Sequence, residues 1–192
     1  FMNPVNDTPQ NRRKNLRQAA KLLQEAGWEI TQAGGRSVLR NAKGEGLSIE
    51  FLLDSPLFER IALPYQQQLA LLGIETKITT VDSAQYERRT QTFDYDVVVG
   101  NWPQSLSPGN EQRDFWGSEA AKRDGSRNLV GIQNPAIDKL IDAVIFAPDR
   151  PALIIACKAL DRALIWNHYV VPMWYIDYER TVRWDRFGRP EK

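Results

Sequence analysis

Apolar residues recur at intervals of three and four along several stretches of the chain, a spacing typical of amphipathic helices. The first stretch begins at Thr8-Pro9 and ends at Gly27, which supply a cap with a first-turn proline and a left-handed stop. The pattern predicts helices over residues 9–26, 56–72, 134–146 and 149–166, and a shorter one from Asp82 or Ser83 through Arg89.

Shorter runs rich in branched and aromatic residues lie between these helices and predict strands. They cover residues 28–30, 37–40, 47–54, 74–81, 95–100 and 170–178. Pro172 interrupts the last run, so we expect this strand at a sheet edge. The order strand, helix, strand, helix, strand from residue 47 predicts an α/β fold with a central, mainly parallel sheet and helices on both faces.

Composition narrows the class of protein. The chain has 192 residues, enough to bury a core as one domain, and its net charge of +1 gives no general attraction to nucleic acid. The single cysteine, Cys157, excludes an internal disulfide and falls on the apolar stripe of a predicted helix, so we expect an inert core residue. No apolar run approaches the roughly 18 residues of a membrane span.

The two ends of the chain are polar and irregular in pattern. The sequence shows no signal peptide. It opens with Phe1-Met2-Asn3-Pro4, without an initiator methionine and with loop-like first residues, which predicts a piece of a longer protein. We expect residues 1–8 and 180–192 to be loosely specified ends.

Catalytic machinery is sparse in this sequence. The one histidine, His168, follows a predicted helix end, where a surface position or a contact with the terminal carbonyls is the expected role. Asp94 and Asp96 are spaced to share one face of a strand, but no third metal ligand lies near in sequence, so a polar turn is the favoured interpretation. No phosphate-binding loop and no nucleophile elbow is present. We therefore predict no enzyme activity, no metal and no cofactor.

The candidate binding site follows the strand Val97–Val99. Gly100-Asn101-Trp102 comes directly after it, and ligands of open α/β sheets bind beyond the carboxyl ends of strands. Trp102 is expected to face a ligand and Trp116 the core. The predicted ligand-binding residues, mostly uncharged hydrogen-bonding groups, are Trp102, Gln104, Ser105, Leu106, Ser107, Asn110, Arg127 and Asn128.

Two roles remain open for Arg127 and Asn128. Arg127 can pair with a ligand carboxylate through two donors at once. Alternatively, Arg127 and Asn128 brace the two loops against each other.

Short motifs along nearly the whole chain resemble one known family. They lie at residues 25–28, 51–53, 59–65, 72–74, 93–96, 134–141 and 171–175. In this order they resemble the C-terminal part of extracellular solute-binding proteins of family 5, the oligopeptide, dipeptide and nickel receptors of ABC importers. Residues 105–113 and 115–118 are similar to the Yej-type oligopeptide branch.

The resemblance implies a type II periplasmic binding protein of the peptide-binding subclass, with two lobes that close around a cleft. Residues 1–192 would form the C-terminal substrate-binding lobe. Its implied partners are a peptide or peptide-like solute, the N-terminal lobe of the same chain and the permease subunits of the importer. The implied location is periplasmic, or the outer face of the cytoplasmic membrane.

One position departs from the family pattern. Several family members carry an aspartate three residues beyond the tryptophan, which takes the peptide's terminal ammonium. Ser105 stands there in this chain, and no carboxylate follows until Glu111. Either another residue meets the amine or the ligand is not a plain peptide.

Two other functions compete with a binding lobe. The first is a non-catalytic lobe of an α/β enzyme whose active groups lie in a missing N-terminal part. The second is an interaction module without a small-molecule site, in which the loop with Trp102 would be buried in the core.

Overall fold

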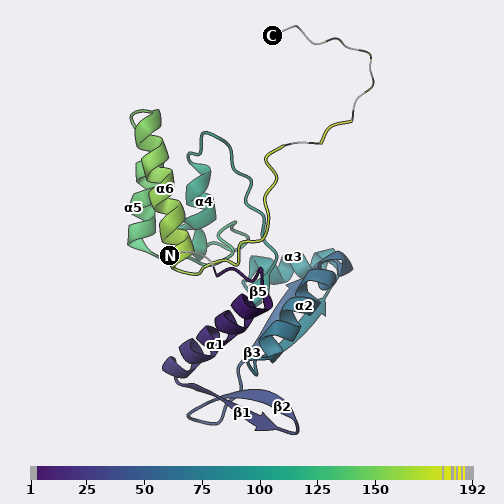
Figure 1. Cartoon of the computed structure of the whole chain (residues 1–192). Coiled ribbons are helices and arrows are strands. Elements are labelled where there is room, and N and C mark those ends of the chain that lie inside the picture. Colours follow the sequence, from purple (N-terminus) through teal and green to yellow (C-terminus); the bar gives the residue numbers. More distant parts are fainter. Residues whose placement is uncertain (1–3, 179, 183, 185, 187, 189–192) are drawn as a thin grey trace.

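A computed structural model of the chain describes residues 4–178, 180–182, 184, 186 and 188 (Figure 1). The helices are α1 (Pro9–Glu25), α2 (Glu59–Ala70), α3 (Ser83–Gln91), α4 (Glu111–Trp116), α5 (Pro135–Ile145) and α6 (Arg150–Trp166), with short 3₁₀ turns η1 (Pro56–Phe58) and η2 (Ala120–Lys122). The strands are β1 (Trp28–Ala33), β2 (Arg36–Asn41), β3 (Ser48–Leu53), β4 (Glu75–Thr80) and β5 (Val97–Val98). The predicted helices are confirmed within a few residues, and α4 is a helix that the pattern did not predict.

Capping side chains set the starts of the long helices. Thr8, Asp82, Asn134 and Asp149 each accept a hydrogen bond from a backbone N–H two or three residues later, which satisfies a donor that the first turn leaves unpaired. Proline occupies one of the first two helical positions in α1, α5 and α6, where its missing N–H is not needed.

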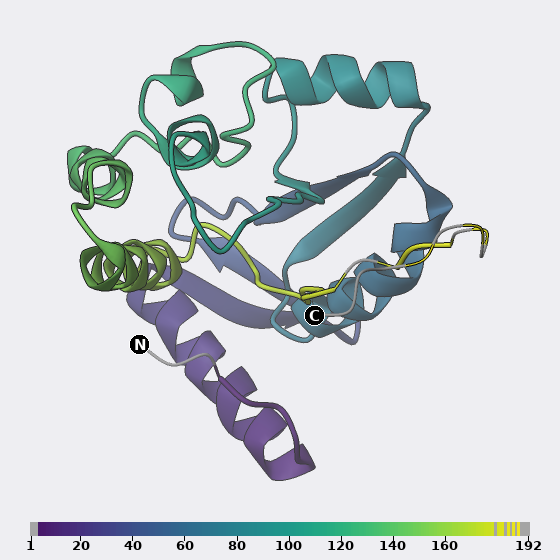
Figure 2. The ribbon, with the colours of Figure 1, turned by 90° about the horizontal axis from the view of Figure 1, so that it is seen from above.

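A parallel sheet of order β4-β3-β5 forms the centre of the fold. Phe51 of β3 pairs with Ile78 of β4 on one side and with Val97 of β5 on the other. The chain steps from β3 to β4 through α2, and then passes back across β3 through α3. Right-handed crossovers in opposite directions place these two helices on opposite faces of the sheet, as Figure 2 shows. The predicted α/β fold with a parallel sheet is confirmed.

The hairpin β1-β2 is antiparallel and forms a small separate sheet. Its buried Leu39 donates its backbone N–H to the carbonyl of Gly73, with an N–O distance of 2.9 Å. Gly73 has φ +76°, and a Cβ there would come within 2.6 Å of the Leu39 nitrogen. Glycine at this position therefore allows the link before β4 to approach the hairpin closely.

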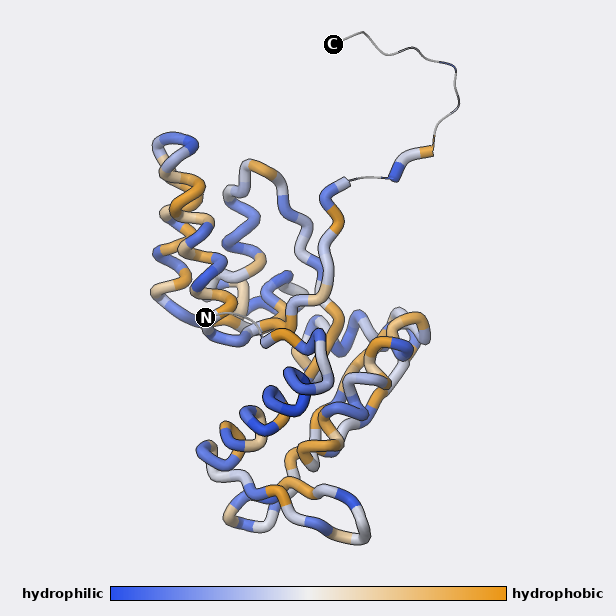
Figure 3. The backbone as a smooth tube through the Cα atoms, viewed as in Figure 1, coloured by the Kyte–Doolittle hydropathy of each residue, from blue (hydrophilic) through white to orange (hydrophobic). Residues whose placement is uncertain are grey.

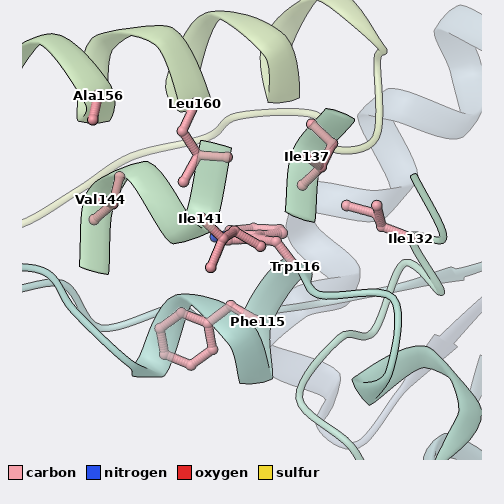
Figure 4. Packing of buried hydrophobic residues seen from close by; sticks show 8 residues of the cluster. All are labelled: Phe115, Trp116, Ile132, Ile137, Ile141, Val144, Ala156 and Leu160. Carbon is pink, nitrogen blue, oxygen red and sulfur yellow. The ribbon is translucent and has the colours of Figure 1, made fainter. Parts of the chain in front are cut away.

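Two groups of buried apolar side chains hold the fold together. Phe51 and Leu53 of β3 pack with Ala62 of α2 on the sheet side. A larger cluster lies between α4, α5 and α6 (Figure 4), and Cys157, predicted to be a core residue, is half-buried and packs against it. The residues of this cluster are Phe115, Trp116, Ile132, Ile137, Ile141, Val144, Ala156 and Leu160. The predicted core position of Trp116 is confirmed, with 7% of the residue exposed.

Helix α1 lies outside both clusters. It has no buried residue, and its surface is largely hydrophilic in Figure 3. The apolar stripe with Leu16 and Leu23 is half-buried at most. Within the described part of the chain, no helix combines the length and apolar character that a membrane crossing needs.

The strand predicted over residues 170–178 is wrong. The chain leaves the helices here as an irregular segment (Figure 1), and Val171, Trp174 and Tyr175 are 67%, 62% and 87% exposed. A strand needs a neighbour to accept and donate its ladder hydrogen bonds, and no described strand lies beside this segment. Its apolar pattern is real, but among the described residues no strand pairs with it.

The predicted loose ends are described only in part. Residues 4–8 precede α1 without regular secondary structure. Residues 1–3, 183, 185, 187 and 189–192 lie outside the described residues.

Candidate functional site

The candidate site is built on the loop that leaves β5 at its carboxyl end. This loop, residues 99–110, is called the Trp102 loop below, and it leads directly into α4. Because β5 belongs to a parallel sheet, the loop lies at the edge where such folds bind their ligands. The predicted residues Trp102, Gln104, Ser105, Leu106, Ser107 and Asn110 all lie on it.

Trp102 is half-buried and is held by two contacts. Its ring lies 4.9 Å from that of Trp116, centroid to centroid, at an angle of 33°. Its Nε1–H donates to the backbone carbonyl of Arg127 at 3.2 Å. The indole is therefore fixed by the fold, and its N–H is already used. The part of the ring that remains exposed can contact a ligand through its apolar surface.

Gln104 and Gln112 tie the middle of the loop to α4 through their amide groups. Gln112 Nε2 donates to Gln104 Oε1 at 2.7 Å, and the return bond measures 3.5 Å. Gln112 is 3% exposed, and its Nε2 also donates to Glu111 Oε1 at 3.2 Å. This pair holds the Gln104 side chain in one place on the loop.

The tip of the loop is a small turn of serine and leucine. The backbone N–H of Ser107 donates to Ser105 Oγ at 3.1 Å. The carbonyl of Leu106 accepts a hydrogen bond from the guanidinium of Arg150, at the start of α6. The Leu106 side chain itself is 86% exposed. The tip thus presents an apolar side chain on an anchored backbone.

Asn110 and Glu111 close the loop at α4. Asn110 Oδ1 accepts from Arg113 Nη1 at 3.2 Å, and Glu111 Oε1 accepts from the Gly109 N–H at 2.8 Å. Burial raises the pKa of Glu111, but hydrogen bonds from the Gly109 and Glu111 amides and from Gln112 outweigh it, so the pKa lies below its ordinary value. Glu111 is therefore an ionised group that already has partners within the fold.

Asn128 is inside the fold and braces it. It is 0% exposed. Its Nδ2 donates to the carbonyls of Gly117 and Ile132 at 3.0 and 3.1 Å, and its Oδ1 accepts from the Ile132 N–H at 3.0 Å. The amide group of Asn128 thus donates two hydrogen bonds and accepts one within the fold. The bracing role left open by the sequence therefore describes Asn128 better than ligand contact.

Arg127 has a different environment from its neighbour. Its side chain is exposed, and its guanidinium carbon lies 4.5 Å from the centroid of the Phe115 ring. Stacking of this kind uses the flat face of the guanidinium and leaves the N–H groups along its edge available. Arg127 thus stays a candidate for binding a carboxylate.

Three supporting features were missed by the sequence reasoning. Gln112 and Arg150 hold the Trp102 loop from α4 and α6, although they lie 8 and 44 residues from their partners in sequence. Helix α4 has six residues, which is too short for a periodic apolar pattern to show. Only the two apolar residues at its end, Phe115 and Trp116, hinted at a packed element there.

The groups considered for other chemistry are bonded into the fold. Asp96 Oδ2 accepts from the Glu50 N–H, and Asp94 pairs with Arg89, each at 2.8 Å. His168 follows the end of α6 and is exposed, which agrees with the surface position expected for it. In the part of the chain that the structure describes, no three His, Cys, Asp or Glu residues are placed to hold a metal ion.

Comparison with known proteins assigns the family. Residues 2–124 match the family described as bacterial extracellular solute-binding proteins, family 5 Middle. The chain belongs to this family. It is 48% identical over 191 residues to a probable peptide-binding protein YejA of Agrobacterium fabrum, and 38% identical over 188 residues to a peptidoglycan-binding protein YepA of the same organism. These alignments cover 100% and 98% of this chain, but only 31% and 30% of the two relatives.

A solved structure shows the same fold. The oligopeptide-binding protein AppA from Bacillus subtilis, in complex with a nonapeptide, matches 80% of this chain and 30% of its own with a TM-score of 0.68 and 25% identity. The resemblance to family 5 that the sequence motifs indicated is therefore confirmed, and so is the fold of type II periplasmic binding proteins. The chain spans less than a third of the length of these relatives.

Proposed function

We propose that this chain is the C-terminal lobe of the substrate-binding component of an ABC importer. The whole receptor captures an oligopeptide or peptide-like solute outside the cytoplasmic membrane, in the periplasm, and delivers it to the permease subunits. The observation that carries the proposal is the Trp102 loop, an anchored polar loop beyond the end of a parallel strand in a chain of family 5. It offers binding groups and no catalytic group, so the protein holds its ligand without changing it.

The surface of the chain supports a role as one part of a larger structure. Large apolar side chains are exposed on it, among them Ile155 and Trp166 on α6 and Tyr175 beyond it. The N-terminal lobe of the receptor is the partner that would cover such faces.

The chemistry of the loop favours a peptide-like ligand. Gln104, Ser105 and Ser107 carry neutral side chains that donate and accept hydrogen bonds, which suits the N–H and C=O groups of a peptide backbone. Leu106 and the exposed part of Trp102 add apolar contact. No charge is placed at the tip, so recognition of the ligand's termini belongs to other residues.

The test uses the full-length receptor that contains these 192 residues. We expect native mass spectrometry of the purified receptor to detect a bound solute with peptide fragments, and calorimetry with that peptide to give one site per chain. The isolated 192-residue chain is the control, and we expect much weaker binding because one wall cannot bury the ligand.

Other results would contradict the proposal. Turnover of the bound solute would favour the lobe of an α/β enzyme instead. A receptor that binds no small molecule under any of these conditions would favour an interaction module.

A further inference from the structure

A strongly basic surface lies on α1. This helix carries five basic residues and one acidic residue, whereas the whole chain has a net charge of +1. The basic residues are Arg12, Arg13, Lys14, Arg17 and Lys21, and all of them are exposed. Figure 2 shows α1 extending away from the sheet, and it is largely blue in Figure 3. Positive charge is therefore concentrated on one outlying helix.

Four of these residues form a stripe along the helix, called the basic stripe below. With 3.6 residues per turn, Arg13, Lys14, Arg17 and Lys21 fall within an arc of about 100° and span about 12 Å of the axis. The other residues on this arc are glutamines. The apolar stripe of α1, described above, lies on a different side and is half-buried, and α1 contacts β1. The basic stripe thus faces solvent while the apolar side of the helix is used within the fold.

Little within the chain neutralises the basic stripe. Among the described residues, Arg13, Lys14 and Arg17 take part in no salt bridge. Lys21 pairs with Glu25 at 3.6 Å, and both side chains are more than half exposed, so this pair contributes little. Arg17 has a like charge four positions away on either side, a spacing that destabilises a helix. An anionic partner would relieve this repulsion.

We propose that the basic stripe docks on an anionic membrane surface, with its cations among the lipid headgroups. Clustered Lys and Arg side chains bind such surfaces, and each one strengthens partitioning about fivefold. A specific protein interface needs an apolar or aromatic centre, whereas the arc of the basic stripe holds only Arg, Lys and Gln. Because its apolar side is covered by the fold, α1 lies on the headgroups and does not insert.

This surface goes beyond the proposed receptor function, because it binds no solute and uses no residue of the Trp102 loop. Under that function, docking holds the receptor beside the membrane that contains its permease. The test is co-sedimentation of the full-length receptor with vesicles of phosphatidylcholine alone, and with vesicles of equal parts phosphatidylcholine and phosphatidylglycerol. We expect binding to the anionic vesicles only. Raising the salt from about 0.1 to 1 M should release the protein, because the screening length falls from about 10 to 3 Å.

Neutralised arginines measure the contribution of the basic stripe. Arg17→Gln should lower partitioning into the anionic vesicles about fivefold, and Arg13→Gln together with Arg17→Gln about 25-fold. Glutamine has nearly the helix propensity of arginine, so α1 should persist in both variants. The matched control is Arg88→Gln together with Arg123→Gln, which changes the net charge equally at two exposed positions outside α1. It should alter partitioning by less than about twofold.

Three results overturn the docking surface: no binding to the anionic vesicles at low salt, equal binding to both kinds of vesicle, or the same loss in the control pair as in the stripe variants. Binding to polyglutamate without binding to the anionic vesicles also overturns it, and indicates an acidic protein partner instead. The comparison of vesicles on the unchanged receptor decides the matter even where a variant folds poorly. The receptor function is tested separately, because solute binding in calorimetry needs no lipid.

Discussion

The indole of Trp102 lies directly against the Cα of Gly100. A Cβ placed on Gly100 would come within 2.6 Å of Trp102 Cη2 and 3.0 Å of Cζ3, closer than carbon atoms approach without something moving. The same indole packs on Trp116. Gly100 and Trp116 therefore fix together where the Trp102 ring lies at the start of its loop.

Gly100→Ala should displace the Trp102 ring from this position. The added methyl group forces the indole or the backbone to shift, and overpacking of this kind costs about 1–3 kcal/mol. We expect a loss of that size in the free energy of unfolding, measured by urea denaturation, with a change in the near-UV circular dichroism of the tryptophans. Gly109→Ala is the control, because a Cβ there meets Glu111 Oε2 at an ordinary 3.6 Å. Equal losses in the two variants would contradict this role of Gly100.

Trp102→Ala should weaken ligand binding by the full-length receptor. If the exposed part of the ring packs on the ligand, its removal costs about 1–3 kcal/mol of binding free energy. Trp102→Phe is the matched variant, since it keeps an aromatic surface but loses the N–H bond to Arg127. We expect it to retain most of the affinity in calorimetry. An alanine variant that is folded and binds with unchanged affinity would remove Trp102 from the site.

The sheet and its helices were predictable because their signals are local. Alternating residues in β3 and β4, capping residues such as Thr8 and Asn134, and short links dictate the strand–helix order, and handedness then dictates the topology. The strand predicted over residues 170–178 failed for the opposite reason. An extended apolar run becomes a strand only beside a partner, and its own sequence does not contain that partner.

The sequence indicated which loop carries most of the candidate residues, but not how their side chains are held. The end of a strand followed by Gly100 and Trp102 indicated the Trp102 loop, and the structure places six candidates on it. Arg127 is exposed and Asn128 is fully buried. This difference depends on their contacts with Phe115 and Gly117, which two adjacent residues in the sequence do not reveal. The anchors Gln112 and Arg150 depend in the same way on contacts across the fold.

Glu50 should make the stability of the chain depend on acid pH. Hydrogen bonds from Arg89 and Thr79 lower the pKa of Glu50 to about 2, from an ordinary value of 4.5. A carboxylate with a lowered pKa stabilises the fold above pH 4.5, and this contribution is lost as the pH falls toward 2. Because the side chain is partly exposed, we expect the contribution to be about 1–2 kcal/mol.

The variant Glu50→Gln isolates this effect. Its free energy of unfolding should be lower than that of the unchanged chain at pH 7, and the difference should shrink as the pH falls from 4.5 to 2. Glu119→Gln serves as the control, because its pair with Lys122 is exposed and surface pairs contribute little. A difference that stays constant across this pH range would show that the carboxylate charge is not the cause.

The paired amides of Gln104 and Gln112 should act as one unit that orders the Trp102 loop. Either Gln104→Ala or Gln112→Ala breaks the same bond, which contributes about 0.5–1.5 kcal/mol. A double-mutant cycle by urea denaturation should therefore give a coupling energy of that size. Hydrogen exchange at residues 103–109 should accelerate in both single variants by a similar factor.

The cost of Gln112→Ala includes more than the lost hydrogen bond. Gln112→Ala also leaves a space in a position that is 3% exposed, so its total cost should exceed that of Gln104→Ala, whose side chain is exposed. Asn110→Ala is the control for the loop, since its side chain bonds only to Arg113 in the described structure. Strictly additive losses for the two glutamines, with exchange in the loop unchanged, would mean that the loop is ordered by Trp102 and Arg150 without them.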